Sequence, residues 1–223
     1  MNIKKDYFLG GGLLLLFALL TWSVVMQAAW VGELDRSVQG IIKYDTQMDT
    51  HIFEVVALLG SPPVVISLTA AICGYLWVKG RRSDSIWIGA CQLLGSGLLL
   101  LIKLLVQRPR PIHQLVADTG FSFPSGHVMC SMVLMLSLLM LMLPKIKEQE
   151  NQFVAILLSM IWIGMVATNR IYLRDHFASD ILGSLLLANG LWFVMLPQAR
   201  YIDALIVKQA AQRSAFRPQR EDK

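Results

Sequence analysis

The chain has 223 residues, 55% of them hydrophobic and only 16% charged, and its mean hydropathy is +0.56. A water-soluble domain carries more charge, so this composition excludes a soluble globule and indicates an integral membrane protein. The net charge of +5 does not indicate a nucleic-acid partner, because the basic residues gather at the ends of apolar segments, where they face lipid headgroups. Cys73, Cys91 and Cys130 lie in apolar runs without a neighbour at metal-ligand spacing, so neither a disulfide scaffold nor a zinc site is expected.

The first apolar run follows Lys4 and Lys5 and extends over residues 8–30. A cleavable signal peptide ending near Gln27 is the alternative interpretation. About 20 apolar residues are the length of a membrane span, whereas the apolar core of a signal peptide has about 7–15. We therefore predict that this run is retained as the first transmembrane helix.

Six segments in all are apolar enough to cross a bilayer. Backbone inside hydrocarbon must satisfy its own hydrogen bonds, and these segments lack the alternating pattern of barrel strands, so they are expected to be helices. The sequence thus predicts an all-α integral membrane bundle, one domain over residues 1–223, whose basic tail at 200–223 is headgroup-bound or disordered. The predicted spans are 8–30, 60–78, 84–107, 126–143, 153–170 and 177–197.

Residues 31–59, between the first two spans, are mixed in character rather than apolar. Their apolar residues recur at helical spacing, as expected for a helical segment that lies along the membrane surface. Two interpretations stay open: an ordinary amphipathic connector, or a wall that guides lipid toward a site. The apolar positions are Leu34, Val38, Ile41 and Ile42, and the polar ones beside them are Asp35, Arg36, Gln39 and Lys43.

The distribution of lysine and arginine predicts the orientation in the cell membrane. With both termini cytoplasmic, the inner side holds 13 of the 20 basic residues, in agreement with the positive-inside rule. The other seven basic residues lie on the outer side of the membrane, and two of them, Arg108 and Arg174, are interpreted as headgroup contacts or loop charges without a catalytic role. The seven outer basic residues are Arg36, Lys43, Lys103, Arg108, Arg110, Arg170 and Arg174.

Three short motifs meet at the extracytoplasmic face. The third and fifth spans end there and the fourth and sixth begin there, so a bundle can bring the motifs together. The first motif closes the third span, the second opens the fourth, and the third connects the fifth to the sixth. Their residues are Lys103 with Arg110-Pro111; Pro124-Ser125-Gly126-His127; and Asn169-Arg170 with His176 and Asp180.

The basic residues of these motifs suit an anionic ligand. Lys103, Arg110 and Arg170 are three cations near a low-dielectric boundary, and a phosphate in its transition state is a natural counterion for them. Ser125 is predicted to be a helix N-cap, so the first-turn N–H groups would point at the anion. Gly126 would let the backbone approach it.

The histidines supply the chemistry. His176 and Asp180 are four residues apart, on one face of the sixth helix, so the carboxylate can fix one imidazole nitrogen and leave the other free as a nucleophile. His127, from another helix, can protonate the departing oxygen and later activate water. The pattern predicts displacement in two steps through a phosphohistidine, without metal ligands.

These residues resemble the three signature motifs of the type 2 phosphatidic acid phosphatases, which share their site with vanadium haloperoxidases. The pattern departs once, because the family usually has serine where this chain has Asn169, whose amide can still donate to a phosphate oxygen. The resemblance implies a lipid phosphatase that needs no metal or other cofactor. It implies His176 as nucleophile, Asp180 as its orienting partner, His127 as acid and base, and Lys103, Arg110, Ser125, Gly126 and Arg170 as phosphate ligands, with Asn169 and Pro124 as further candidates.

The substrate follows only by analogy. The compact chain is similar to bacterial enzymes that act on phosphatidylglycerophosphate or undecaprenyl diphosphate, with phosphatidic acid and diacylglycerol pyrophosphate as alternatives. Lipid substrate and membrane lipids are therefore the expected partners, with no obligate protein partner. A soluble vanadate-dependent haloperoxidase would not have six spans. An anion transporter would carry polar residues near the bilayer midplane, whereas the last three spans have charges at one end only.

Overall fold

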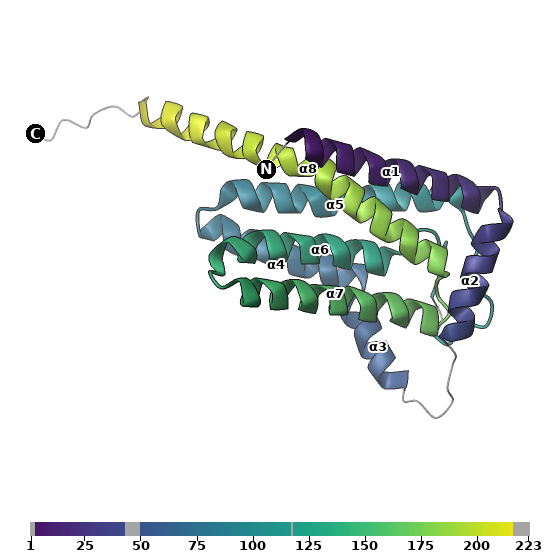
Figure 1. Cartoon of the computed structure of the whole chain (residues 1–223). Coiled ribbons are helices and arrows are strands. Elements are labelled where there is room, and N and C mark those ends of the chain that lie inside the picture. The colour runs from purple at the N-terminus through teal and green to yellow at the C-terminus, as the bar shows by residue number, and fades with distance from the viewer. Residues whose placement is uncertain (1–2, 43–49, 117, 216–223) are drawn as a thin grey trace, which may run out of the picture.

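The computed structural model describes residues 3–42, 50–116 and 118–215 and contains only helices and loops in these ranges (Figure 1). The predicted all-α class is confirmed. Lys43 and residues 216–223, to which the sequence assigned surface and tail positions, lie outside the described residues. The helices are α1 (Ile3–Val25), α2 (Ala29–Ile41), α3 (Thr50–Leu59), α4 (Pro62–Val78), α5 (Arg82–Val106), α6 (Gly126–Met142), α7 (Gln149–Tyr172) and α8 (Ala178–Ala215), with a short 3-10 turn, η1 (Leu143–Lys145).

Five helices among the described residues are each long and apolar enough to cross a membrane: α1, α5, α6 together with η1, α7, and the Ala178–Ala199 part of α8. The predicted span at 60–78 is different. Its helix α4 is shorter and reaches spanning length only together with His51–Leu59 of α3, from which it is bent by 45°. Pro62 opens α4, where its missing N–H leaves no intrahelical bond unmade. Six spans are therefore reached when the bent pair counts as one, and the surface segment is reduced to α2.

Two other helices, the first and the last, differ from their predicted limits. The first helix begins at Ile3 and ends at Val25 rather than at residue 30, because Gln27 takes a left-handed φ of 50° and the chain turns into α2. The last helix runs through Pro197 to Ala215, so the part of the predicted tail that the structure describes is helical. A mixed, basic composition did not distinguish a helical extension from a disordered tail.

Helix α8 lies at the centre of the bundle and contacts α1, α2, α5 and α6. Glycines allow α1 and α8 to approach closely. A Cβ on Gly10 would lie 2.8 Å from Val194 Cγ2, and one on Gly190 would lie 2.9 Å from the side chain of Leu14. Small residues at such a crossing let membrane helices pack backbone against backbone. The first and last spans are thus held side by side (Figure 1).

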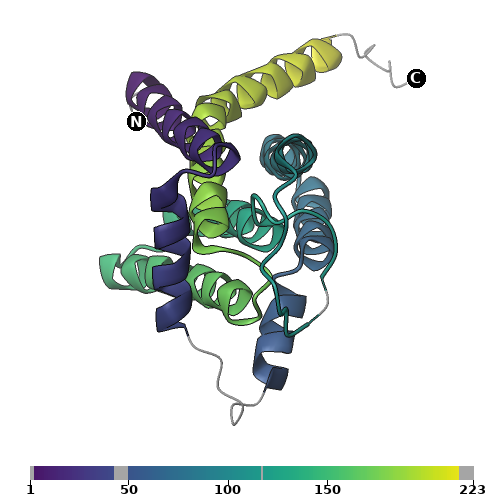
Figure 2. The same ribbon diagram turned by 90° about the vertical axis from the view of Figure 1, so that its right-hand side faces the viewer.

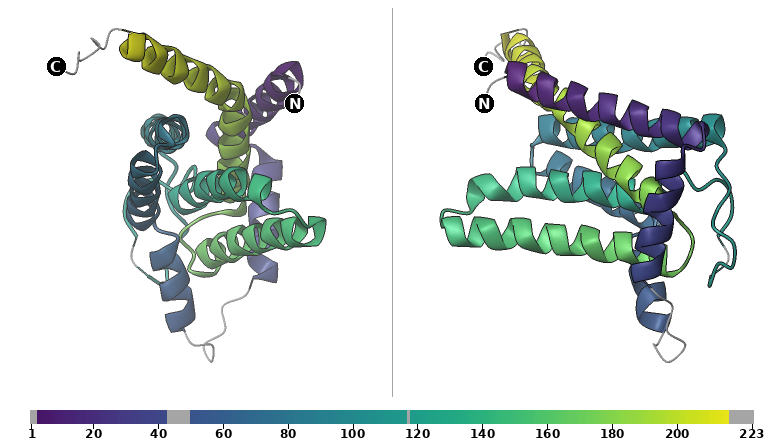
Figure 3. Two further views of the ribbon diagram at one scale, coloured as in Figure 1. Left: turned by 90° about the vertical axis from the view of Figure 1, so that its left-hand side faces the viewer. Right: turned by 45° about the vertical axis from the view of Figure 1, so that its right-hand side comes forward.

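All three motifs lie at one end of the bundle. Helices α5 and α7 end there and α6 and α8 begin there, at the right of Figure 1. Viewed from this end in Figure 2, α2 and the segment between α5 and α6 lie across the helix ends, and the right-hand view of Figure 3 shows α2 crossing them side-on. The common side that span parity predicted for the motifs is therefore present in the fold.

Candidate active site

The centre of the site is His176, which lies in the short segment between α7 and α8 and is 1% exposed. The sequence placed it on the last helix, but α8 begins two residues later, at Ala178. The expected pairing is nevertheless present, with Nδ1 of His176 3.3 Å from Oδ2 of Asp180. An ionised carboxylate only accepts hydrogen bonds, so Nδ1 carries the hydrogen and Nε2 keeps its lone pair. Nε2 lies 3.4 Å from Nη1 of Arg110, at the proposed anion position.

Burial sets the protonation of His176. It lowers the pKa of the imidazole to about 4, although Asp180 acts in the opposite direction. The folded ring therefore takes up its proton at a lower pH than the unfolded ring, whose pKa is 6.5. The neutral form contributes stability that is fully present above pH 6.5 and is lost as the pH falls toward 4.

This gives a pH prediction. We expect the thermal midpoint of the wild-type protein to fall more between pH 7 and pH 4.5 than that of His176→Gln, which has no group to titrate. In a histidine-labelled sample, the ring nitrogen signal that is absent from the Gln variant should titrate near pH 4. Titration of that signal at an ordinary histidine pKa would contradict the assigned burial.

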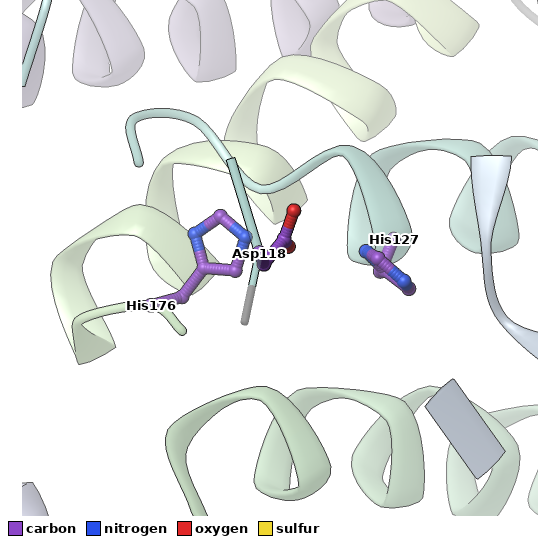
Figure 4. A group of neighbouring side chains, drawn as sticks. All are labelled: Asp118, His127 and His176. Atoms are coloured by element: carbon purple, nitrogen blue, oxygen red, sulfur yellow. The ribbon is translucent and has the colours of Figure 1, made fainter. Parts of the chain in front are cut away.

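His127 approaches His176 from the first turn of α6. Figure 4 shows both imidazoles with Asp118 between them, and the ligand atoms of the three side chains lie within 4.8 Å of one another. Such a group has the spacing of a cation site, but Arg110 and Arg170 both bind the Asp118 carboxylate, at 3.0 and 2.7 Å. Two guanidinium groups at this position favour an anion and disfavour a metal ion. The predicted meeting of the two histidines at one face is present.

The cations of the first and third motifs lie near this point, but among them only the two arginines pair with Asp118. Arg110 and Arg170 reach the same carboxylate oxygen of Asp118. Lys103, on the last turn of α5, instead donates from Nζ to the backbone carbonyls of Phe121 and Ser122. Its ammonium group thereby supports the segment that leads into the second motif, and its charge still lies near Arg110.

The second motif differs in detail from its predicted geometry. Ser125 is the N-cap of α6, as predicted, but its hydroxyl does not cap the helix. This Oγ is buried and has no hydrogen-bond partner among the described residues, so it is free to bind a phosphate oxygen. A Cβ on Gly126 would lie 3.2 Å from Cγ of Pro62, so the glycine is needed for packing against α4 as well. Pro124 follows Phe123 through a cis peptide bond.

Asn169 has a structural partner in place of the predicted anion. Its amide Nδ2 donates to the backbone carbonyl of Phe53, and the Phe53 ring stacks on Tyr172 with centroids 3.9 Å apart. These contacts attach α3 to α7 behind the site. The structure therefore does not place Asn169 among the phosphate donors.

Arg108 is the residue that the sequence analysis assigned wrongly. It is not a headgroup contact, because its side chain is 15% exposed and its Nη1 donates to Oδ1 of Asp180 at 2.6 Å. Its Nη2 donates to Asp35 of α2 at 2.7 Å, and the guanidinium group lies 4.1 Å above the ring of Phe177. Asp180 is thus held from one side by His176 and from the other by Arg108.

Three acidic residues of the site were missed as well. Asp35 could have been found, because it shares the buried face of α2 with Val31, and a charge on such a face needs a partner. Its Oδ1 accepts from the backbone N–H of Ser179 at 2.8 Å. Asp175, which is 1% exposed, accepts from Arg170 at 2.8 Å, and burial raises its pKa to about 6. Asp118 lies in an irregular segment, and no motif or periodic pattern in the sequence indicates that it belongs to the site.

Two cavities adjoin these residues. A smaller one, of about 200 Å³, is lined by His127, Arg170, Asp118 and Asp175 among others. A larger one, of about 590 Å³, is lined on one side by α2 and on the other by the segments that carry Arg110 and Arg174. Arg110 thus faces the wider and partly apolar cavity, whereas His127 and Arg170 face the smaller one.

The arrangement defines a class of protein: a multi-pass membrane bundle with two close histidines and two converging arginines at one end. Residues 84–203 match the family model of the PAP2 superfamily, and the chain belongs to this superfamily. It is 34% identical over 117 residues to phosphatidylglycerophosphatase B of Bacillus subtilis (strain 168), a match that covers 49% of this chain and 57% of the relative. The chain thus matches little more than half the length of this relative.

A solved structure shows the same fold. The crystal structure of a transmembrane PAP2-type phosphatidylglycerolphosphate phosphatase from Bacillus subtilis superposes with a TM-score of 0.72 and 22% identity. The superposition covers 86% of this chain and 96% of that one. All three motifs lie within the residues that match the superfamily model.

Proposed function

We propose that this chain is a lipid phosphatase of the membrane that removes the terminal phosphate of a lipid phosphomonoester or diphosphate. The observation that carries the proposal is the unprotonated Nε2 of buried His176, which lies 3.4 Å from Nη1 of Arg110, with His127 within the same 4.8 Å cluster. An unprotonated imidazole at the edge of a site for anions is a nucleophile placed for attack on phosphorus. Membership of the PAP2 superfamily supports the same chemistry.

The reaction has two steps. Nε2 of His176 forms a bond to phosphorus while the bond from phosphorus to the lipid oxygen breaks, and protonated His127 gives its proton to that oxygen. The lipid alcohol leaves, and a phosphohistidine remains. His127 then accepts a proton from water as the water oxygen attacks phosphorus, which releases phosphate and restores both imidazoles. Arg110, Arg170 and Ser125 would stabilise the charge that builds up on the equatorial oxygens.

No step requires a metal ion, because the guanidinium groups supply the positive charge. Phosphate release should therefore persist in a chelator and be inhibited by orthovanadate, which resembles the five-coordinate transition state. A transporter of anions, the alternative from another class, would release no phosphate under either condition. Loss of activity in the chelator, restored by a divalent metal, would refute the mechanism.

Phosphatidylglycerophosphate and undecaprenyl diphosphate are the proposed substrates, ahead of phosphatidic acid and diacylglycerol pyrophosphate. The name of the Bacillus subtilis relative supports the first of these. The larger cavity gives a physical reason to place both ahead of phosphatidic acid, because the lipid that leaves still carries a phosphate, as it also does for diacylglycerol pyrophosphate. Arg36 and Arg174 line this cavity together with Arg110, and the buried Nε of Arg174 has no hydrogen-bond partner among the described residues.

A substrate panel tests this preference. With purified protein in detergent, Arg174→Gln should raise the KM for phosphatidylglycerophosphate and undecaprenyl diphosphate about tenfold, the effect of losing about 1.4 kcal/mol of binding. The KM for phosphatidic acid, which has no second phosphate, should stay within about twofold. Arg82→Gln, at the opposite end of the bundle, is the matched control. An equal rise for all substrates would assign Arg174 to general attraction of anions.

We further propose that both termini are cytoplasmic and that the site faces the extracytoplasmic side of the cell membrane. The excess of lysine and arginine at the other end of the bundle supports this orientation. Activity of intact cells toward an impermeant phosphate ester added outside would test it. The chain is proposed to work on membrane lipid without nucleic acid and without an obligate protein partner.

A further inference from the structure

An acidic side chain of the protein itself occupies the position proposed for the substrate phosphate. A single oxygen of Asp118, Oδ2, lies 3.0 Å from Nη1 of Arg110 and 2.7 Å from Nη2 of Arg170. Both arginines belong to the motifs that are proposed to bind phosphate. The same carboxylate lies within 4.8 Å of ring nitrogens of His127 and His176 (Figure 4). One anionic oxygen bridging two guanidinium groups, opposite the nucleophile, has the geometry of a bound phosphate oxygen.

Asp118 differs from the other acids of the site in its exposure. Its side chain is 30% exposed, whereas those of Asp175 and Asp180 are 1% and 0% exposed. The two buried acids have fixed partners in Gln114 and Arg108 besides the site residues. Asp118 lines the cavity beside His127, so its carboxylate can leave toward water while Arg170 stays paired with Asp175. It is the acid of this site that an incoming anion can displace.

The contacts around Asp118 hold the arginines in place when it is displaced. Arg110 also donates to the backbone carbonyls of Thr119 and Gly120, at 3.0 and 3.2 Å, and Arg170 keeps its ion pair with Asp175. A phosphate would therefore meet two guanidinium groups that are already oriented. Only the carboxylate has to move, by rotation about its own side-chain bonds.

We propose that Asp118 is an internal competitor for the phosphate site and thereby determines how weakly the enzyme holds free phosphate. Any anion that binds between Arg110 and Arg170 must replace the carboxylate, so its apparent dissociation constant is raised by the stability of that contact. The carboxylate raises the apparent dissociation constant by the same factor for every anion, but the effect on site occupancy differs between free phosphate and a lipid substrate. Orthophosphate in solution has no other anchor, whereas a lipid substrate is concentrated in the membrane beside the site. Return of the carboxylate also helps to expel the product.

Direct anion binding tests the proposal. The full-length protein in detergent would be titrated with orthophosphate and, separately, with orthovanadate, by calorimetry on the wild type and on Asp118→Asn. The asparagine keeps the shape of the side chain and removes its charge. We expect the variant to bind both anions at least tenfold more tightly and to show a correspondingly lower inhibition constant for orthophosphate in lipid hydrolysis. Asp118→Ser should change binding in the same direction, which guards against an effect peculiar to the amide.

Asp84→Asn is the matched control, because Asp84 pairs with Arg81 at the start of α5, at the opposite end of the bundle. It should bind both anions like the wild type. Unchanged or weaker binding by Asp118→Asn and Asp118→Ser, with a wild-type melting profile, would overturn the proposal and leave the carboxylate as a structural brace.

The inference rests on the proposed function in taking the competing anion to be a substrate phosphate. The result of the anion titration does not depend on lipid hydrolysis. If the wild type releases phosphate from no lipid and Asp118→Asn still binds orthophosphate more tightly, the proposed function fails and this inference stands. If lipid hydrolysis is found and the Asp118 variants bind orthophosphate no more tightly than the wild type, the proposed function stands and this inference fails.

Discussion

Replacement of His176 by alanine should lower the rate of phosphate release by about 10⁴- to 10⁶-fold, with little change in KM. Losses of this order follow when the nucleophile of an enzyme is removed and only binding and electrostatic stabilisation remain. The measurement is release of inorganic phosphate from phosphatidylglycerophosphate by purified protein at equal detergent-to-lipid ratio. His51→Ala, a substitution of an exposed histidine of α3, is the control and should keep full activity.

His127→Ala separates the two steps of the same mechanism. With a lipid substrate, the loss of the acid should slow release by about 10²- to 10⁴-fold. With p-nitrophenyl phosphate, whose leaving group needs no proton, the first step should proceed and the phosphohistidine should accumulate, because no base activates water. Acid-labile, alkali-stable phosphate on His176 after a quench would identify it. Unimpaired lipid hydrolysis by either variant would refute the assigned roles.

The second large effect is expected for Arg108, which no motif-based role had singled out. Arg108→Ala leaves the carboxylates of Asp35 and Asp180 buried without their shared cation. Breaking a buried ion pair from one side typically costs about 3–5 kcal/mol of the free energy of unfolding. We also expect kcat to fall by about 100-fold or more, because Asp180 loses the partner that fixes it against His176. Unfolding in denaturant and steady-state kinetics measure the two effects.

Two further variants distinguish positioning from general stability. Arg108→Ala combined with Asp35→Asn should recover part of the lost stability, because one of the uncompensated charges is removed, but not the lost kcat. Arg81→Ala removes an arginine from a half-buried pair with Asp84 at the surface and should change the free energy of unfolding by about 1 kcal/mol or less. Full recovery of kcat in the double variant would contradict a role of Arg108 in orienting Asp180.

The residues of the three motifs could be placed at one end of the bundle from the sequence alone, because span parity is independent of side-chain detail. The histidine pair was found because His127 and His176 each stand in a motif with fixed spacing. The contacts of Arg108 were not found, since they depend on an aspartate 73 residues away on α2. Gln107 just before it takes a left-handed φ of 50°, which no pattern of residues near it foretold.

The limits of the helices were predicted less well than the end of the bundle at which the motifs lie, and for a physical reason. Hydropathy reports which segments prefer lipid, but it reports neither the 45° bend between α3 and α4 nor the packing of α3 on α7 through Phe53 and Tyr172. The position of Asp118 is a further case. Its acidity is visible in the sequence, but its place between two arginines depends on the path of an irregular segment.

The contact between α1 and α8 has a consequence for biogenesis. During synthesis the first helix leaves the ribosome long before its partner exists, so it must wait in the bilayer as an isolated span, which its apolar surface permits. Asp35 likewise waits for Arg108, which is made 73 residues later, and for Ser179, which is made 144 residues later. A nascent chain that has not yet made α8 lacks Ser179 and Asp180, so we expect hydrolytic activity to arise only when the last helix has been inserted.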